Sequence, residues 1–125
     1  MGLKALRYST VFVTIASVDN EMLVQFYTQF FKQKPIVYIP NSYAEFQLSS
    51  LRLGIFKPKD NHQSEFNGQT SGGMSLCIEV ERLEEAIAHL TTLGYLPSGD
   101  IITASHGREI YAYDPAGNRL ILHES

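Results

Sequence analysis

The sequence contains no tryptophan and a single cysteine, Cys77. One cysteine excludes an internal disulfide and is typical of a protein in a reducing compartment, so we expect the cytoplasm. The formal net charge is −3, and no cluster of Lys and Arg is present. Because nucleic acids and anionic membranes are bound through basic patches, we expect neither of them as a partner.

Long apolar runs are absent as well. No segment approaches the roughly 20 apolar residues that a membrane-spanning helix needs. The N-terminal segment MGLKALRYST contains no apolar core of the length found in a signal peptide. The chain has 125 residues, of which 44% are hydrophobic and 18% charged. We therefore expect one folded domain with a hydrophobic core.

The first half of the chain has the pattern of a strand, a helix and three further strands. Residues 10–16, TVFVTIA, are rich in β-branched side chains and predict a strand. Asp19 is placed to cap a following helix, whose apolar side chains recur with a period near 3.6 residues. Short strands separated by turn residues are then predicted over 36–39, 43–48 and 51–56.

The second half repeats this order of elements. A strand is predicted over residues 74–80 and a helix over 82–93, with Gly94 as the C-cap of the helix. A further strand and a hairpin are predicted at 101–104, 109–113 and 119–123. Overlaying LRLGIF on NRLILH places Arg52 on Arg119 and Gly54 on Ile121. Both halves therefore read βαβββ, which indicates a duplicated module.

A polar segment, KPKDNHQSEFNGQTSG, separates the two modules and predicts a loop. We expect a single domain over residues 1–125, with a first module at 8–57, a connecting loop at 58–72 and a second module at 73–125. Each module is expected to form a half-sheet with a helix on its outer face. The predicted fold class is α+β, with two βαβββ modules whose curled mixed sheets surround a cleft.

The closing hairpin carries the most specific motif in the chain. Its sequence, IYAYDPAGNRLIL, resembles the aromatic-x-aromatic-x-Asp-Pro-x-Gly-Asn ending of the vicinal oxygen chelate superfamily. This superfamily includes glyoxalase I, extradiol dioxygenases, fosfomycin-resistance enzymes and bleomycin-resistance proteins. The opening VTIASVDNEMLVQFYTQFF is similar to the superfamily's strand, Asp, helix and Phe-Tyr segment, although Phe31-Lys32 replace the usual Leu-Gly. The resemblance runs from Val11 to His123 and implies the glyoxalase/bleomycin resistance-like fold.

The metal-ligand positions implied by this resemblance carry poor ligands. In metal-dependent members, four side chains, typically His, Gln or Glu, hold a divalent ion. Matched by position, the four fall on Phe12, Gly54, Ser75 and Ile121. A shift of one residue turns each strand over and offers no better donors. We therefore expect no metal and no other cofactor.

Other polar residues near these positions have two interpretations. Glu79 and His123 each lie an even number of residues after a matched position, Ser75 or Ile121, so their side chains are expected on the same face of the sheet and at the rim of the cleft. A rim in which they are solvated or paired with each other is the simpler interpretation of the two residues, and a ligand role is the alternative. His106 lies in a polar loop and is interpreted as a bystander. Cys77 is interpreted as a small buried hydrophobe, because no basic neighbour in the sequence would activate its thiolate.

The alternation of side chains along each strand also predicts which of them face the cleft. They combine aromatic and small residues with a few polar groups, which is the usual composition of a small-molecule pocket. The predicted cleft residues are Phe12, Thr14, Arg52, Gly54, Phe56, Ser75, Cys77, Glu79, Tyr111, Tyr113, Ile121 and His123. A cleft filled by its own side chains is the alternative.

Two functional classes follow from these residues. The first is a small-molecule-binding protein without a catalytic metal. The alternative is a lyase, isomerase or dioxygenase-type enzyme for a small oxygenated substrate, with Glu79, His123 or Glu45 as the general base. We expect a small-molecule ligand as the partner, together with a second copy of the chain in a homodimer. Exposed sheet edges need covering, and modules of this superfamily pair within or across chains.

Overall fold

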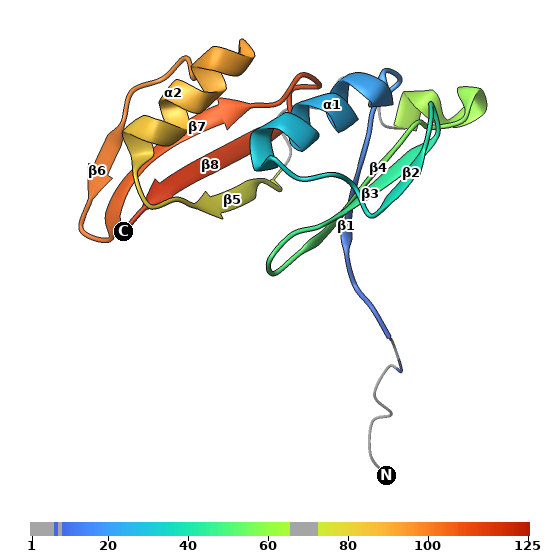
Figure 1. Ribbon diagram of the computed structural model, residues 1–125, viewed down its shortest axis with the longest axis horizontal. Helices are drawn as coiled ribbons and strands as arrows, with labels where there is room; N and C mark the ends of the chain where they lie inside the picture. The colour runs from blue at the N-terminus through green and yellow to red at the C-terminus, as the bar shows by residue number, and fades with distance from the viewer. Residues whose placement is uncertain (1–6, 8, 66–72) are drawn as a thin grey trace.

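The computed structural model describes residue 7, residues 9–65 and residues 73–125, and it consists of two βαβββ modules (Figure 1). The first module contains β1 (Val13–Ala16), α1 (Asn20–Phe31), β2 (Val37–Ile39), β3 (Tyr43–Gln47) and β4 (Arg52–Phe56). A 3-10 helix, η1 (Asp60–Glu65), follows it. The second module contains β5 (Leu76–Glu79), α2 (Leu83–Leu93), β6 (Ile102–Ala104), β7 (Gly107–Tyr113) and β8 (Arg119–Glu124). The predicted fold class is confirmed.

The two sheets have the same topology. Their strand orders are β1-β4-β3-β2 and β5-β8-β7-β6, and in each the first strand pairs in parallel with the fourth strand of its module. The remaining neighbours are antiparallel. Thr14 lies opposite Gly54, and Cys77 lies opposite Ile121. The equivalence of Gly54 and Ile121 that the sequence overlay predicts is therefore present in the strand register.

Both helices end as their sequences predict. Asp19 caps α1, and its carboxylate accepts a hydrogen bond from the backbone nitrogen of Met22 at 3.2 Å. Gly94 follows α2 with φ of 96°, a left-handed conformation that glycine adopts without steric cost. The N-terminus of α2 has no side-chain cap of its own. The carboxylate of Glu124 on β8 accepts from the backbone nitrogen of Leu83 at 3.2 Å instead.

One hydrophobic core runs through both modules. α1 packs on β4, α2 packs on β8, and the two helices contact each other. The hydroxyl of the buried Tyr27 on α1 donates to the carboxylate of Asp114 in the β7–β8 turn at 2.6 Å. This contact joins the helix of one module to the closing turn of the other.

The remaining differences from the sequence predictions are local. β1 begins at Val13 instead of residue 10, and β5 begins at Leu76 instead of residue 74. The predicted loop at 57–72 contains η1, and residues 66–72 lie outside the described part of the chain. Among the described residues, neither helix is both long and apolar enough to span a membrane.

Candidate ligand-binding site

Each sheet has one face against a helix and one open face. On β8, Leu120 and Leu122 are fully buried, whereas Ile121 and His123 are half-buried on the other face. On β5, Cys77 and the exposed Glu79 alternate with residues that pack against the core. Side chains on these strands therefore alternate between the core and the open face as predicted, and the candidate residues lie on the open faces.

On the open face of the first module, Arg52 lies between an aromatic ring and a carboxylate. Its guanidinium carbon lies 5.7 Å from the centre of the Phe12 ring, and its Nε lies 3.3 Å from a carboxylate oxygen of Glu45. The hydroxyl of Tyr43 donates to the other oxygen of Glu45 at 2.7 Å. Burial and this carboxylate raise the pKa of Tyr43 to about 12.

The space that a side chain at Gly54 would occupy on this face is filled by its neighbours. A Cβ atom built on Gly54 would lie 2.9 Å from the hydroxyl oxygen of Tyr43 and 3.1 Å from Cγ2 of Thr14. The glycine is needed because the Tyr43 side chain crosses over it. In the single chain, the matched metal-ligand position on β4 is therefore covered by Tyr43 and Thr14.

The open face of the second module repeats the arginine motif. The guanidinium carbon of Arg119 lies 5.7 Å from the centre of the Tyr111 ring. Nε of Arg119 donates to the hydroxyl oxygen of Ser75 at 2.6 Å. Arg52 and Arg119 are the two arginines that the sequence overlay matches, and each lies against an aromatic ring. The rings come from different places in the two modules, because Phe12 precedes β1 whereas Tyr111 lies on β7, so the duplication extends to the arginines and not to their aromatic partners.

A cavity of about 110 Å³ lies where β1 approaches β5. Its walls are mainly apolar, and its polar lining side chains include Thr14, Ser75, Asn118 and Arg119. Thr14 and Ser75 are predicted cleft residues, and the structure brings them to one cavity. The sequence prediction did not include Arg119 among the cleft residues. Its match to Arg52 in the overlay was the signal that could have identified it.

A second cavity, of about 240 Å³, lies between the β3–β4 turn and β5. Cys77 and Glu79 line it together with Ser49 and Ser50 of the turn. Cys77 is exposed, so its interpretation as a buried hydrophobe is wrong, because no element of the described chain covers this face of β5. Partial desolvation, followed by the charges of Glu79 and Glu109, raises the pKa of the Cys77 thiol.

The other predicted cleft residues do not line these two cavities. They lie on the open faces of their own sheets and are Phe12, Arg52, Gly54 and Phe56 in the first module and Tyr111, Tyr113, Ile121 and His123 in the second. Glu45 is on the first of these faces, paired with Arg52. In the single chain, the predicted site is thus divided between two sheet faces that approach each other near Thr14 and Ser75.

A polar cluster forms at the far end of the second face. Nδ1 of His123 lies 2.5 Å from a carboxylate oxygen of Glu79, so the pairing expected for these two residues is present. This hydrogen bond raises the pKa of His123. The ring of His106 stacks on that of His123 with centroids 5.2 Å apart, and its Nε2 lies 3.7 Å from a carboxylate oxygen of Glu109. His106 therefore lies against the predicted rim residue His123.

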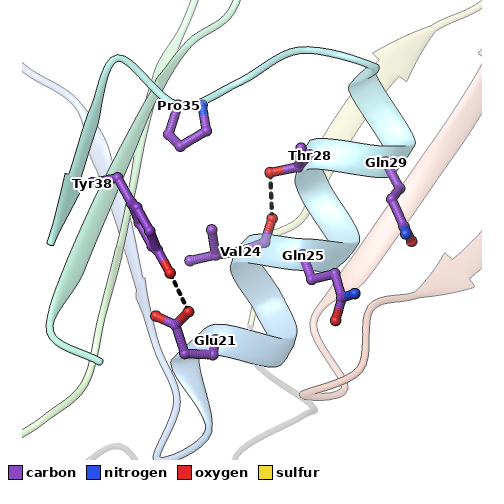
Figure 2. Close-up of a pocket in the computed structure, with 7 residues that line it drawn as sticks. All are labelled: Glu21, Val24, Gln25, Thr28, Gln29, Pro35 and Tyr38. Carbon is purple, nitrogen blue, oxygen red and sulfur yellow. Dashed lines mark hydrogen bonds between the residues drawn. The ribbon is translucent and has the colours of Figure 1, made fainter. Parts of the chain in front are cut away.

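A larger groove, of about 420 Å³, lies between α1 and the segment that leads into β2 (Figure 2). The hydroxyl of Tyr38 donates to one carboxylate oxygen of Glu21, and the backbone nitrogen of Asn41 donates to the other at 2.8 Å. No predicted site residue lines this groove. Its acidic group is already held by two donors.

Comparisons with known proteins agree with the architecture. No protein-family model and no curated protein matches the sequence. A glyoxalase/bleomycin resistance protein from Catenulispora acidiphila is similar in structure, with 19% identity over 92% of this chain and 96% of that chain and a TM-score of 0.65. The fosfomycin resistance protein FosX from Listeria monocytogenes has 16% identity over 96% and 95% of the two chains and a TM-score of 0.74. Lactoylglutathione lyase from Agrobacterium tumefaciens has 17% identity over 95% and 96% and a TM-score of 0.70.

The match to these structures covers nearly the whole length of both chains in each case. The repeated strand order, the parallel β1–β4 and β5–β8 pairs and the helix on one face of each sheet account for it. The chain therefore has the paired βαβββ fold of the glyoxalase and bleomycin resistance proteins.

Proposed function

We propose that this chain is a small-molecule-binding protein whose ligand contacts the open sheet faces around the cavity between β1 and β5. The observation that carries the proposal is the convergence of Thr14, Ser75 and Arg119 on a mainly apolar cavity, whose other polar lining groups, on Tyr27 and Asn118, already donate to Asp114. Apolar walls with a few convergent polar groups are typical of ligand pockets. The hydroxyls and the guanidinium favour a ligand with several oxygen atoms, and the neighbouring Tyr111 favours a partly aromatic one.

The proposed binding mode uses no metal at the four positions matched by the resemblance. The Phe12 ring and the Ile121 side chain offer no donor atom. Gly54 has no side chain, and Tyr43 covers it. The Ser75 hydroxyl accepts a hydrogen bond from Arg119 and is a poor ligand for a divalent transition ion. The chemistry of these side chains supports binding without a catalytic ion there.

The proposed assembly is a homodimer in the cytoplasm. Exposed aromatic side chains on the open faces support it, because Phe12, Tyr111 and Tyr113 are 39%, 39% and 41% exposed in the single chain. A second copy laid against these faces would cover them and enlarge the cavity. Every residue of the edge strands β2 and β6 is exposed, which also favours a covering partner.

The alternative is a lyase, isomerase or dioxygenase-type enzyme. One observation favours it: Glu79 orients His123, and a carboxylate-held imidazole is a common general base. One of the similar structures is a lactoylglutathione lyase. A binding protein returns its ligand unchanged, whereas an enzyme returns a product, so mass analysis of the bound compound separates the two classes.

A thermal-shift screen over metabolites and antibiotics tests the binding proposal. A compound at a hundred times its Kd stabilises the native state by about 2.7 kcal/mol, which corresponds to several degrees in Tm. Ser75→Phe places a ring in the cavity between β1 and β5 and is expected to abolish the shift while the protein stays folded. Ser98→Phe is the matched control, because Ser98 is exposed and lines neither cavity. A shift that persists in Ser75→Phe would place the ligand elsewhere.

A further inference from the structure

Three ionisable side chains form a row across the second sheet. His123 on β8 lies opposite Glu79 on one neighbouring strand and opposite Glu109 on the other. All three share the open face, because they alternate with the buried Leu122 and Ile110. Residues directly opposite on neighbouring strands have side chains in contact distance. The histidine is therefore flanked by a carboxylate on each side.

A second histidine completes this cluster from the β6–β7 turn. His106 precedes β7 by one residue, and its ring lies nearly parallel to that of His123, at an angle of 11°. One ligand atom from each of His106, Glu109 and His123 lies within 4.8 Å of the other two. Two imidazoles and a carboxylate thus converge at one point on the surface of the sheet.

His123 has one ring nitrogen without a partner. Nδ1 lies 2.5 and 2.6 Å from the two oxygens of Glu79, which can only accept, so Nδ1 carries the proton. Nε2 is buried and makes no hydrogen bond to the described residues, and the side chain is only 14% exposed. When the imidazole is neutral, the contact with Glu79 keeps the proton on Nδ1 and leaves the lone pair on Nε2. A buried polar atom without a partner is costly unless something binds it.

We propose that His106, Glu109 and His123 form a binding site for a divalent transition-metal ion of the Zn²⁺ type, with Glu79 orienting His123. Two histidines and one glutamate are an established zinc-ligand set, and three protein ligands leave a coordination position for water or a small molecule. A carboxylate on the other ring nitrogen of a ligating histidine fixes its tautomer and raises its basicity. Glu79 meets that requirement.

The three ligand atoms, which lie within 4.8 Å of one another, must move closer together by up to about 1.5 Å to bind an ion. Ligand atoms about 2.0–2.1 Å from a tetrahedral ion are roughly 3.3 Å from one another. Nε2 of His106 and the nearest oxygen of Glu109 are 3.7 Å apart. The His106 side chain is 63% exposed in a turn and is free to move by such an amount, whereas His123 is held by the sheet.

This site differs from the one implied by the superfamily resemblance. Its ligand on β8 is His123, two residues beyond Ile121, and its other ligands come from the β6–β7 hairpin instead of from β1 and β5. The sequence-based expectation was that the chain holds no metal, and the proposal departs from it at residues that the sequence analysis interpreted as a mutual pair, Glu79 and His123, and as a bystander, His106. The inference goes beyond the proposed function, since ligand binding near Thr14 and Ser75 does not depend on it.

Calorimetric titration of Zn²⁺ into chelator-treated full-length protein tests the proposal. One equivalent is expected to bind to the wild-type chain. His106→Ala and Glu109→Gln should each weaken the Kd at least tenfold, and Glu79→Gln should weaken it by 10- to 100-fold as an outer-shell change. His62→Ala is the matched control, because it removes an exposed histidine of η1 outside the cluster and should bind Zn²⁺ as the wild type does.

Two readouts independent of affinity accompany the titration. Circular dichroism shows whether each variant is folded, and the exposed position of His106 makes His106→Ala the variant least able to disturb the sheet. The ¹⁵N chemical shift of Nε2 in His123 should change on Zn²⁺ addition while Nδ1 stays protonated. Wild-type protein that binds no Zn²⁺ at millimolar concentration would overturn the proposal. So would equal affinity in the wild type and folded His106→Ala.

Discussion

Tyr27→Phe tests how the two modules are held together. Tyr27 is fully buried on α1, and its hydroxyl is 2.6 Å from the carboxylate of Asp114 in the β7–β8 turn. Burial and the neighbouring carboxylate raise the pKa of Tyr27, so the hydroxyl is protonated and can donate at neutral pH. Phenylalanine keeps the ring and removes only this donor.

The expected loss of stability is about 2 kcal/mol. Hydrogen bonds to charged groups contribute roughly 1.5–3 kcal/mol. Asp114 keeps other donors after the change, because the backbone nitrogens of Ala116 and Asn118 and the side-chain amide of Asn118 lie 2.8–2.9 Å from its carboxylate. The ring contact with Phe26, at 4.9 Å between centroids, is also kept. For a chain of this length, the loss corresponds to a fall in Tm of about 8 °C.

Urea denaturation followed by circular dichroism measures this loss, with the m-value as a check that the unfolding transition is unchanged. Tyr95→Phe is the matched control, since the Tyr95 ring also packs on Phe26 but its hydroxyl makes no hydrogen bond to the described residues. The control is expected to change the free energy of unfolding by less than about 0.5 kcal/mol. A change as small in Tyr27→Phe would refute the role assigned to this hydrogen bond.

Three further predictions concern pH, backbone conformation and assembly. Arg108 lowers the pKa of Glu84 to about 2, so the stability that Glu84 contributes is fully present above its ordinary pKa of 4.5 and is lost as the pH falls through about 2. The wild type should therefore have a higher Tm than Glu84→Gln at pH 7, and this difference should disappear near pH 2. A difference that is the same at both pH values would contradict the prediction. Gly107 has φ of 133°, and a Cβ there would lie 2.2 Å from the carbonyl oxygen of Glu124. Gly107→Ala should therefore lower the free energy of unfolding by about 1–3 kcal/mol or more in a denaturant titration. An unchanged unfolding midpoint in Gly107→Ala would contradict the prediction. Sedimentation should show a dimer that dissociates only on dilution, whereas a monomer at all concentrations would exclude the proposed homodimer.

Much of the fold could be predicted because it depends on local patterns. Asp19 and Gly94 mark helix ends through chemistry that acts within a few residues. The strand register that matches Gly54 with Ile121 could be predicted because a duplicated module imposes the same pairing twice. The open-face position of Tyr111 follows from the alternation of side chains along β7.

The contacts that define the site could not be predicted in the same way. Tyr27 and Asp114 are 87 residues apart in the chain, and no local pattern indicates that they meet. Cys77 has the residue type of a core position, yet it is exposed because its sheet face has no cover in the single chain. His106 lies in a loop, as predicted, but the sequence does not indicate that the tight β6–β7 turn brings its ring against His123.

Mass analysis of bound compounds tests the central claim, which is that the open sheet faces hold a small molecule and leave it unchanged. Each compound that raises the Tm of the wild type but not of Ser75→Phe would be incubated with an equimolar amount of protein and recovered. Chromatography with mass spectrometry should return the compound with its original mass and retention time. A new mass, or an isomer with a new retention time that forms with the wild type and not with Ser75→Phe, would show that the protein is an enzyme and contradict the binding proposal.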